Sequence, residues 1–177
     1  MYRRILPAIS LLAVLASPAV AQQQTNSSTV FDNWLMNCST QTDKDNKTLK
    51  ACEVRSTLIV QDQQTKQQGV AAVIAVGRAM TEKTMRAAVQ LPIAAQLNKP
   101  VKLAGADDKA LIDLQYAACQ PQMCSAVADL TDAQVAALKK AGEKIFLVYT
   151  NQAGQEVKLD AATKGLSQAL DTLAREK

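Results

Sequence analysis

The residues best suited to chemistry in this sequence are four cysteines, Cys38, Cys52, Cys119 and Cys124. The last two have four residues between them and lie between two apolar runs in LQYAACQPQMCSAVADL, residues 114–130. Closely spaced cysteines can form half of a metal site, a redox-active dithiol or a structural disulfide. Each alternative predicts a different function, and the compartment of the protein helps to decide among them.

The N-terminal segment indicates export. It carries Arg3 and Arg4, then an apolar run over residues 5–15, then the small-residue triplet 19–21. This order is typical of a secretory signal peptide that is cleaved after Ala21. The apolar run is shorter than the roughly 20 residues that a membrane-spanning helix needs. We therefore expect residues 1–21 to be a signal peptide, and the mature chain to be periplasmic or secreted without an integral membrane segment.

In an oxidising compartment, an even set of cysteines predicts a disulfide framework. Four cysteines allow three pairings, and local spacing favours Cys38–Cys52 and Cys119–Cys124. A zinc site is disfavoured because the spacings are C-x13-C and C-x4-C and the chain has no histidine. A redox site would show C-x-x-C at a helix N-terminus. The cysteines are therefore expected to be structural, with no metal and no cofactor.

The composition offers little for catalysis. Without histidine, the Ser-His-Asp and Cys-His nucleophile systems and the common histidine metal triads are excluded. Asp43 and Asp45 resemble the start of a calcium loop, but Val54 stands where the bidentate glutamate should be. Asp107 and Asp108 follow a glycine and indicate a β-turn. We expect a protein that is not an enzyme, with catalysis by carboxylates alone as the remaining enzymatic alternative.

The charge of the chain argues against nucleic-acid binding. Loss of Arg3 and Arg4 with the signal peptide lowers the formal net charge from +4 to +2. The remaining Lys and Arg residues are scattered, whereas nucleic-acid binders cluster them and add aromatic stacking platforms. The expected partner is therefore a protein or a cell surface and not a nucleic acid.

The elements that must position these residues are mostly short β-strands. Residues 22–29 are polar and aperiodic and are predicted to be a flexible lead. The folded domain is expected to span residues 30–177. Alternating or valine-rich apolar runs, separated by turn residues, predict strands at 30–38, 52–61, 70–76, 84–92, 101–105, 110–119, 125–130, 144–150 and 155–159.

Two segments break the β pattern. Thr131 and Gln134 form a capping-box pattern and Gly142 is suited to a helix end, so a short helix is predicted near 132–141. Apolar residues with helical spacing over 166–173 predict a C-terminal helix that packs its leucines on the body. The expected fold class is mainly β, a single-domain antiparallel β-sandwich of immunoglobulin-like type with these two helices.

Seven segments of the chain carry a resemblance, in the order WLMNC, CEV, VQLPIAAQLNKPVKL, YAACQPQMCSA, ALKKAG, IFLVYTNQAGQEVKL and KGLSQALDTL. Together they resemble the invasion-associated locus B family of Gram-negative, mainly alphaproteobacterial, exported proteins. Trp34, four residues before Cys38, is among the most specific matches. The resemblance implies a single β-sandwich-like domain with paired cysteines, exported to the periplasm or beyond. Some members are linked to host-cell invasion, and the family implies no shared biochemical activity.

The chain departs from the family pattern at turn and packing positions. Met123 stands where the family commonly has glycine, and Gly165-Leu166 replaces its usual glycine-phenylalanine pair. A third departure is at residues 91–94, LPIA, because the LP pair is often followed by glycine in the family. These changes leave the expected fold intact.

Two kinds of residue remain as candidates for a role. Trp34 is expected to be a core residue and not a ligand platform. The candidate contact loop, clipped between the last two cysteines, comprises Gln120, Pro121, Gln122 and Met123. The expected function is a non-catalytic exported interaction protein that contributes to host-cell invasion or to the envelope. The alternative is a periplasmic small-ligand-binding β-sandwich with a deep apolar pocket between its sheets.

Overall fold

The chain forms ten β-strands and two helices. The structure, a computed structural model, describes residues 25–61, 65–78 and 84–176. The predicted signal peptide lies outside the described residues. In chain order the elements are β1 Thr25–Phe31, β2 Trp34–Thr42, β3 Thr48–Gln61, β4 Gln68–Arg78, β5 Arg86–Pro92, β6 Val101–Ala104, β7 Ala110–Cys119, β8 Met123–Asp129, α1 Asp132–Lys139, β9 Lys144–Thr150, β10 Glu156–Ala162 and α2 Leu166–Arg175.

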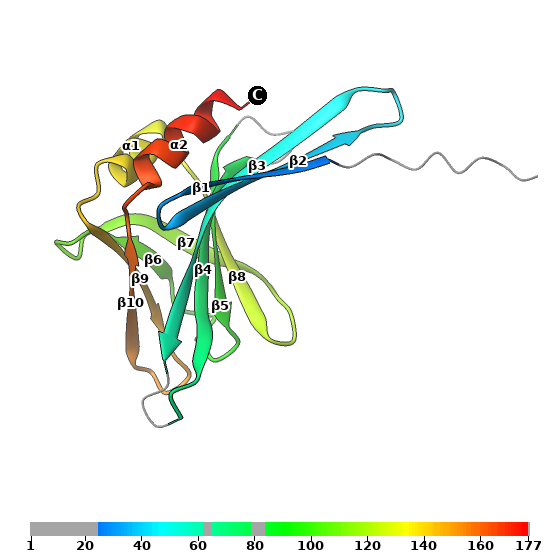
Figure 1. Cartoon of the computed structure of the whole chain (residues 1–177). Helices are drawn as coiled ribbons and strands as arrows, with labels where there is room; N and C mark the ends of the chain where they lie inside the picture. Colours follow the sequence, from blue (N-terminus) through cyan, green and yellow to red (C-terminus); the bar gives the residue numbers. More distant parts are fainter. Residues whose placement is uncertain (1–24, 62–64, 79–83, 177) are drawn as a thin grey trace, which may run out of the picture.

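The strands follow one continuous order, β1-β2-β3-β4-β5-β8-β7-β6-β9-β10, and every pairing is antiparallel. The sheet curls so that β10, at one end of this order, comes back into contact with β3 (Figure 1). The mainly β, antiparallel fold with two helices is therefore confirmed. Two halves of one curled sheet face each other, which is compatible with the predicted sandwich.

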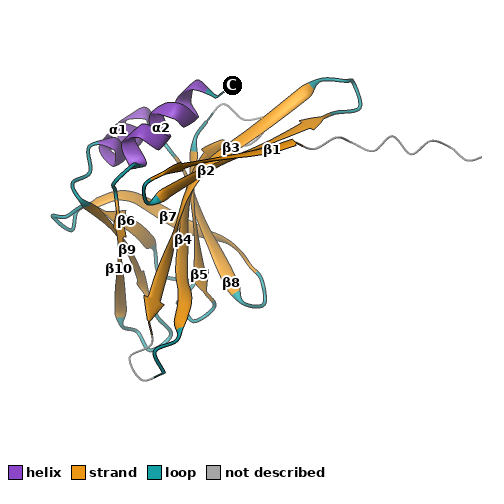
Figure 2. Cartoon of the chain, in the orientation of Figure 1, coloured by secondary structure: helices purple, strands orange, loops and turns teal. Residues whose placement is uncertain are grey.

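Two parts of the curled sheet differ in position. The wing, which comprises β1, β2 and residues 48–55 of β3, projects beyond the rest of the molecule (Figure 1). The body comprises the remainder of β3 and strands β4 to β10. Both helices lie at one end of the body, with α2 packed on the wing and on α1 (Figure 2). The wing is thus held at an angle to the body by α2.

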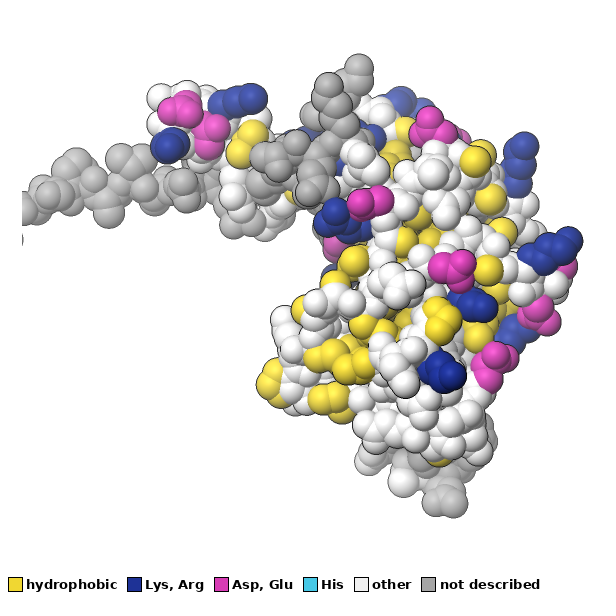
Figure 3. Space-filling model, turned by 180° about the vertical axis from the view of Figure 1, so that it is seen from behind, with side chains coloured by type: hydrophobic (Ala, Val, Ile, Leu, Met, Phe, Trp, Pro, Cys, Tyr) yellow, Lys and Arg dark blue, Asp and Glu magenta, His cyan; other side chains and the backbone are white. Residues whose placement is uncertain are grey.

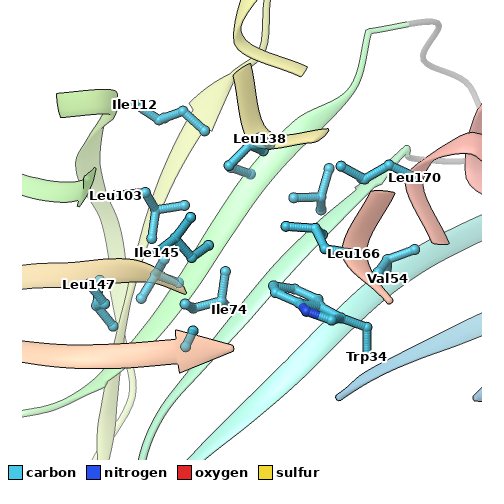
Figure 4. Close-up of a cluster of buried hydrophobic side chains, with 14 of the residues drawn as sticks. Trp34, Val54, Ile74, Leu103, Ile112, Leu138, Ile145, Leu147, Leu166 and Leu170 are labelled. Carbon is cyan, nitrogen blue, oxygen red and sulfur yellow. The ribbon is translucent and has the colours of Figure 1, made fainter. Parts of the chain in front are cut away.

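The interior is filled by large apolar side chains that point inward from alternate strand positions. Trp34 from the wing, Ile74 from β4 and Leu147 from β9 are each at most 1% exposed and belong to one buried cluster (Figure 4). The Trp34 Nε1 donates a hydrogen bond to the Ala162 carbonyl at 2.9 Å. Burying an aliphatic side chain such as Ile74 or Leu147 stabilises the fold by about 1.5–3 kcal/mol. The prediction that Trp34 belongs to the core is confirmed.

Both predicted helices are confirmed. The α1 capping box forms as expected, because the Gln134 N–H donates to the Thr131 hydroxyl and the Thr131 N–H donates to the Gln134 side chain. The C-cap of α1 is Lys140, in a right-handed conformation, so the helix ends earlier than Gly142. In α2 the buried residues are the predicted apolar ones, Leu166, Ala169, Leu170 and Leu173.

The N-terminal boundary of the domain differs from the expectation. Residues 25–29 were expected in the flexible lead, but they belong to β1 and pair with β2. All five side chains are polar and exposed, so the segment shows no alternation of apolar and polar residues, and backbone pairing with β2 at the sheet edge makes it a strand. The predicted strand 30–38 is also wrong as a single strand. A turn at Asp32, with φ of 50°, divides it into β1 and β2, a conformation that aspartate tolerates better than most residues.

Candidate interaction surface

A groove of about 620 Å³ lies on the outer face of the sheet, where the wing meets the body. It is lined by residues of five adjacent strands, β1 to β5. Seen from behind, the surface is hollowed beneath the wing and charges of both signs gather at this corner (Figure 3). Strand spacings of about 4.8 Å give the groove a length of about 19 Å from β1 to β5, which matches about six extended residues. We call this feature the outer groove.

The floor of the outer groove is made of small residues. On β4 the outward-facing positions between the buried Ile74 and Val76 and beyond are held by Ala75 and Gly77. On β5 the floor is formed by Ala88, which also faces outward between buried residues. Glycine is required at position 77 because β3 approaches the backbone of β4 closely there. A Cβ atom at this position would lie 2.9 Å from the carbonyl oxygen of Cys52 and 2.9 Å from the Cβ of Glu53. The absence of a side chain therefore lets β3 and β4 stay paired where the wing diverges from the body.

The two ends of the outer groove differ in chemistry. The wing end carries neutral polar side chains, and the Ser28 hydroxyl donates to the Asn37 side chain at 2.7 Å. Toward the body the groove carries charges, because Glu53 at the base of the wing faces Gly77, and Gly77 faces Arg86 in the strand register. Each end can therefore hydrogen-bond a different part of a bound segment.

The arginines of the outer groove are fixed by neighbouring groups. The Arg86 Nε donates to Asp129 Oδ1 at 2.8 Å, from the neighbouring strand β8. Arg78 donates through Nη1 to the backbone oxygen of Glu176 at 3.1 Å, and the Glu176 carboxylate pairs with Lys50. The Nε of Arg78 is buried without a hydrogen-bond partner among the described residues. These contacts tie the end of α2 to the corner that holds the groove.

Both favoured disulfides are present, and each joins directly opposed residues of a hairpin. Cys38 on β2 faces Cys52 on β3, and Cys119 on β7 faces Cys124 on β8. Both cysteines of the first bridge belong to strands that line the outer groove, but their side chains are buried on the opposite, inward face, where their sulfurs lie near the Glu176 carboxylate at the end of α2. The second closes the tip of the β7–β8 hairpin. Both are therefore structural clips that fix the register of adjacent strands.

The predicted contact loop lies at the tip of the β7–β8 hairpin and does not line the outer groove. Gln120, Pro121 and Gln122 are exposed, whereas Met123 is half-buried and begins β8. The Gln120 N–H donates to the Met123 carbonyl at 2.8 Å. The sequence therefore located an exposed clipped loop, but the structure places the larger concave surface elsewhere.

Reactive groups do not converge on a catalytic arrangement in the part of the chain that the structure describes. The one cluster there with the composition of a metal site is Cys38, Cys52 and Glu176, and its two sulfurs are joined to each other. Such a disulfide provides no thiolate ligand. Burial raises the pKa values of Tyr116 and Tyr149 above the ordinary tyrosine value, so both stay protonated.

Several acidic side chains lie in dispersed surface ion pairs. The Lys144 Nζ donates to Asp160 Oδ2 at 2.6 Å, and this hydrogen bond lowers the pKa of Asp160 and raises that of Lys144. Lys109 likewise lowers the pKa of Asp107, in the turn that the sequence predicted. Such exposed pairs each contribute little to stability. They explain the perturbed pKa values as surface pairing and not as acid–base chemistry.

The residues of the outer groove carried no recognisable sequence motif. Its members come from positions between 26 and 88 that are brought together only by strand order. The one usable signal is the alternation of large and small residues along β4, where Ile74 and Val76 point inward and Ala75 and Gly77 point outward. None of the described helices is long and apolar enough to cross a membrane.

Comparisons with known proteins give a family match and structural matches. The family model described as "Invasion associated locus B (IalB) protein" matches residues 34–174. A crystal structure of invasion associated protein B from Bartonella henselae aligns with 83% of this chain and 95% of that chain, at 20% sequence identity and a TM-score of 0.62. At this identity the structural match shows a shared fold. The search of curated proteins gives no match.

Proposed function

Since the chain belongs to the invasion-associated locus B family, we propose that it is an exported protein that acts by binding another protein and not by catalysis. The observation that carries this proposal is the outer groove, whose floor of small side chains leaves room above β4 and β5 for the side chains of a partner. Its length suits an extended segment of about six residues. Neutral polar groups at the wing end and charges of both signs at the other end can pair with such a segment.

Export is supported by three features. The N-terminal segment has the organisation of a secretory signal peptide. All four cysteines form disulfides, which persist in oxidising compartments. The family is of the periplasmic or extracellular type. We infer that the mature protein begins at Gln22 and works in the periplasm or outside the cell.

The expected role is contact with a host cell or with the bacterial envelope. The structural relative from Bartonella henselae is named for invasion, and a protein-binding groove on an exported domain is suited to such contact. The absence of histidine, together with the dispersed acidic groups of the described residues, supports a role without catalysis.

The small-ligand alternative receives less support. It requires an apolar pocket between the facing halves of the sheet, and that space holds the packed core of Figure 4. A cavity at the seam between β3 and β10 measures about 200 Å³, whereas ligand pockets usually measure about 300–1,000 Å³. The larger outer groove is open along a sheet face, which favours an extended protein segment over an enclosed small molecule.

The experiment is affinity capture with the oxidised protein as bait, from periplasmic extract and from host-cell membranes. Ala88→Gln fills the floor of the outer groove, and Ala136→Gln makes the same change on the exposed face of α1 as a matched control. The proposal expects one reproducible partner that the wild type and Ala136→Gln retain and Ala88→Gln loses. Equal capture by both variants, or no reproducible partner, contradicts it.

A further inference from the structure

The curled sheet has two edges, and they differ in how they are protected. The first edge is β1 and the second is β10. An edge strand presents unpaired N–H and C=O groups at alternate residues, and proteins usually block such edges with charges, proline or bulges. The second edge is protected in two ways, because β10 contacts β3 where the sheet curls and because Glu156, Lys158 and Asp160 place an exposed charge at every second position.

The first edge has none of these protections. Strand β1 reads TNSSTVF and contains no charged residue, no proline and no glycine. Its pairing with β2 runs through all seven residues without a bulge. Val30 near its end is 70% exposed, the highest value among the large apolar side chains of the described residues. The wing also projects from the body, and no described strand pairs with the outer side of β1 (Figure 1).

We propose that β1 pairs with β1 of a second copy of this chain, antiparallel and centred on Ser28, to form a symmetric dimer with one continuous sheet. This register pairs all seven residues of the strand. It places Ser28 opposite its own counterpart and Ser27 opposite Thr29, and hydroxyl pairs of this kind stabilise antiparallel strands. The exposed Val30 then packs beside Asn26 of the other copy.

The charge pattern favours a second β1 over the other strand edge as the occupant. Two β1 strands bring no like charges together, because neither carries a charge. A head-to-tail contact of β1 with β10 would leave the charges of β10 at the interface without matching partners on β1. It would also generate open chains, whereas pairing of two β1 strands closes as a two-fold dimer.

The test is the oligomeric state of the purified full chain, with both disulfides intact and no other protein present. The interface is small, so sedimentation equilibrium is expected to show a dimer with a dissociation constant on the order of 10–100 µM. Ser28→Lys places two positive charges opposite each other and is expected to weaken the dimer at least about 10-fold. Ala136→Lys adds the same charge on α1 and is expected to leave the dimer unchanged. Circular dichroism of both variants verifies that the fold is retained.

A second variant tests the register without relying on destabilisation. Directly opposed residues of antiparallel strands have Cα atoms about 4.5–5.5 Å apart, which a disulfide can span. Ser28→Cys is therefore expected to form a covalent dimer under mild oxidation, and Lys158→Cys on β10 is expected to stay monomeric. The proposal is overturned by a monomer at all concentrations, by a dimer that Ser28→Lys does not weaken, or by cross-linking through Lys158→Cys alone. These outcomes are measured on the purified protein alone, whereas partner capture is tested with Ala88→Gln, so the two proposals can fail independently although Ser28 also lines the outer groove.

Discussion

The packing of α2 can be tested by placing alanine at each of two glycines that have similar backbone conformations but different surroundings. Gly165, the N-cap of α2, has φ of 87°, and Gly154, in the β9–β10 turn, has φ of 80°. Alanine at either position would have to adopt the left-handed region, at a cost of about 1–2 kcal/mol. Their surroundings differ, since a Cβ at Gly165 would lie 2.0 Å from the Phe31 carbonyl oxygen, whereas at Gly154 the nearest atom is 4.0 Å away.

We predict that Gly165→Ala lowers the free energy of unfolding by at least about 3 kcal/mol. The left-handed backbone accounts for part of this loss, and the rest arises because α2 or the β1–β2 hairpin must move and partly expose a buried leucine. Gly154→Ala is predicted to cost only about 1–2 kcal/mol. At 2–4 °C per kcal/mol for a domain of this size, the midpoints are expected to fall by roughly 6–12 °C and 2–8 °C, respectively.

Equilibrium unfolding in urea, with both disulfides intact, measures the two free energies. The fluorescence of the single tryptophan, Trp34, reports the same region, because this residue is buried in the wing beneath α2. If the two variants lose equal stability, the contact between Gly165 and Phe31 does not hold α2 in place, and the described packing of the helix on the wing is wrong.

Three further predictions concern the core, the disulfides and the surface charges. Trp34→Phe should cost about 2–4 kcal/mol in urea unfolding, since it removes volume from the core and leaves the carbonyl on β10 without its donor; a loss below 1 kcal/mol would contradict this. Replacing both cysteines of the β2–β3 disulfide with alanine should cost about 3 kcal/mol, against about 2 kcal/mol for the β7–β8 disulfide, because the first closes the longer loop. The reverse order of thermal midpoints would refute this. The depressed pKa of Asp160 means that its contribution to stability is present above the ordinary aspartate pKa and is lost as pH falls through the depressed value. An NMR titration should show the pKa of Asp160 rising toward the ordinary value in Lys144→Gln, and an unchanged value would show that Lys144 is not the cause.

Local signals in the sequence predicted much of the fold. The capping box at Thr131, the leucine spacing in α2 and the separation of the cysteines are each contained in a short segment, so their consequences could be derived without the tertiary structure. The burial of Trp34 followed from its size and its place in a strand beside a disulfide.

What could not be predicted depends on pairing between distant segments. Strand β1 is polar, and it is a strand because β2 holds it there. The outer groove arises where five strands meet, and its floor consists of residues such as Ala88 that have no chemical signature of their own. Sequence reasoning therefore selected the clipped loop beside Met123, whose cysteines mark it locally, and missed the groove that only the strand order assembles.

Binding through the outer groove is tested most directly by site-specific photo-cross-linking. A photoreactive amino acid is placed at Ala88 on the groove floor, and in a second variant at Ala136 on α1, and each protein is irradiated in the living bacterium or on host cells. The proposed function predicts that one partner is attached reproducibly at Ala88 and not at Ala136. Equal labelling at the two positions, or no adduct at Ala88, would show that the outer groove is not the contact surface.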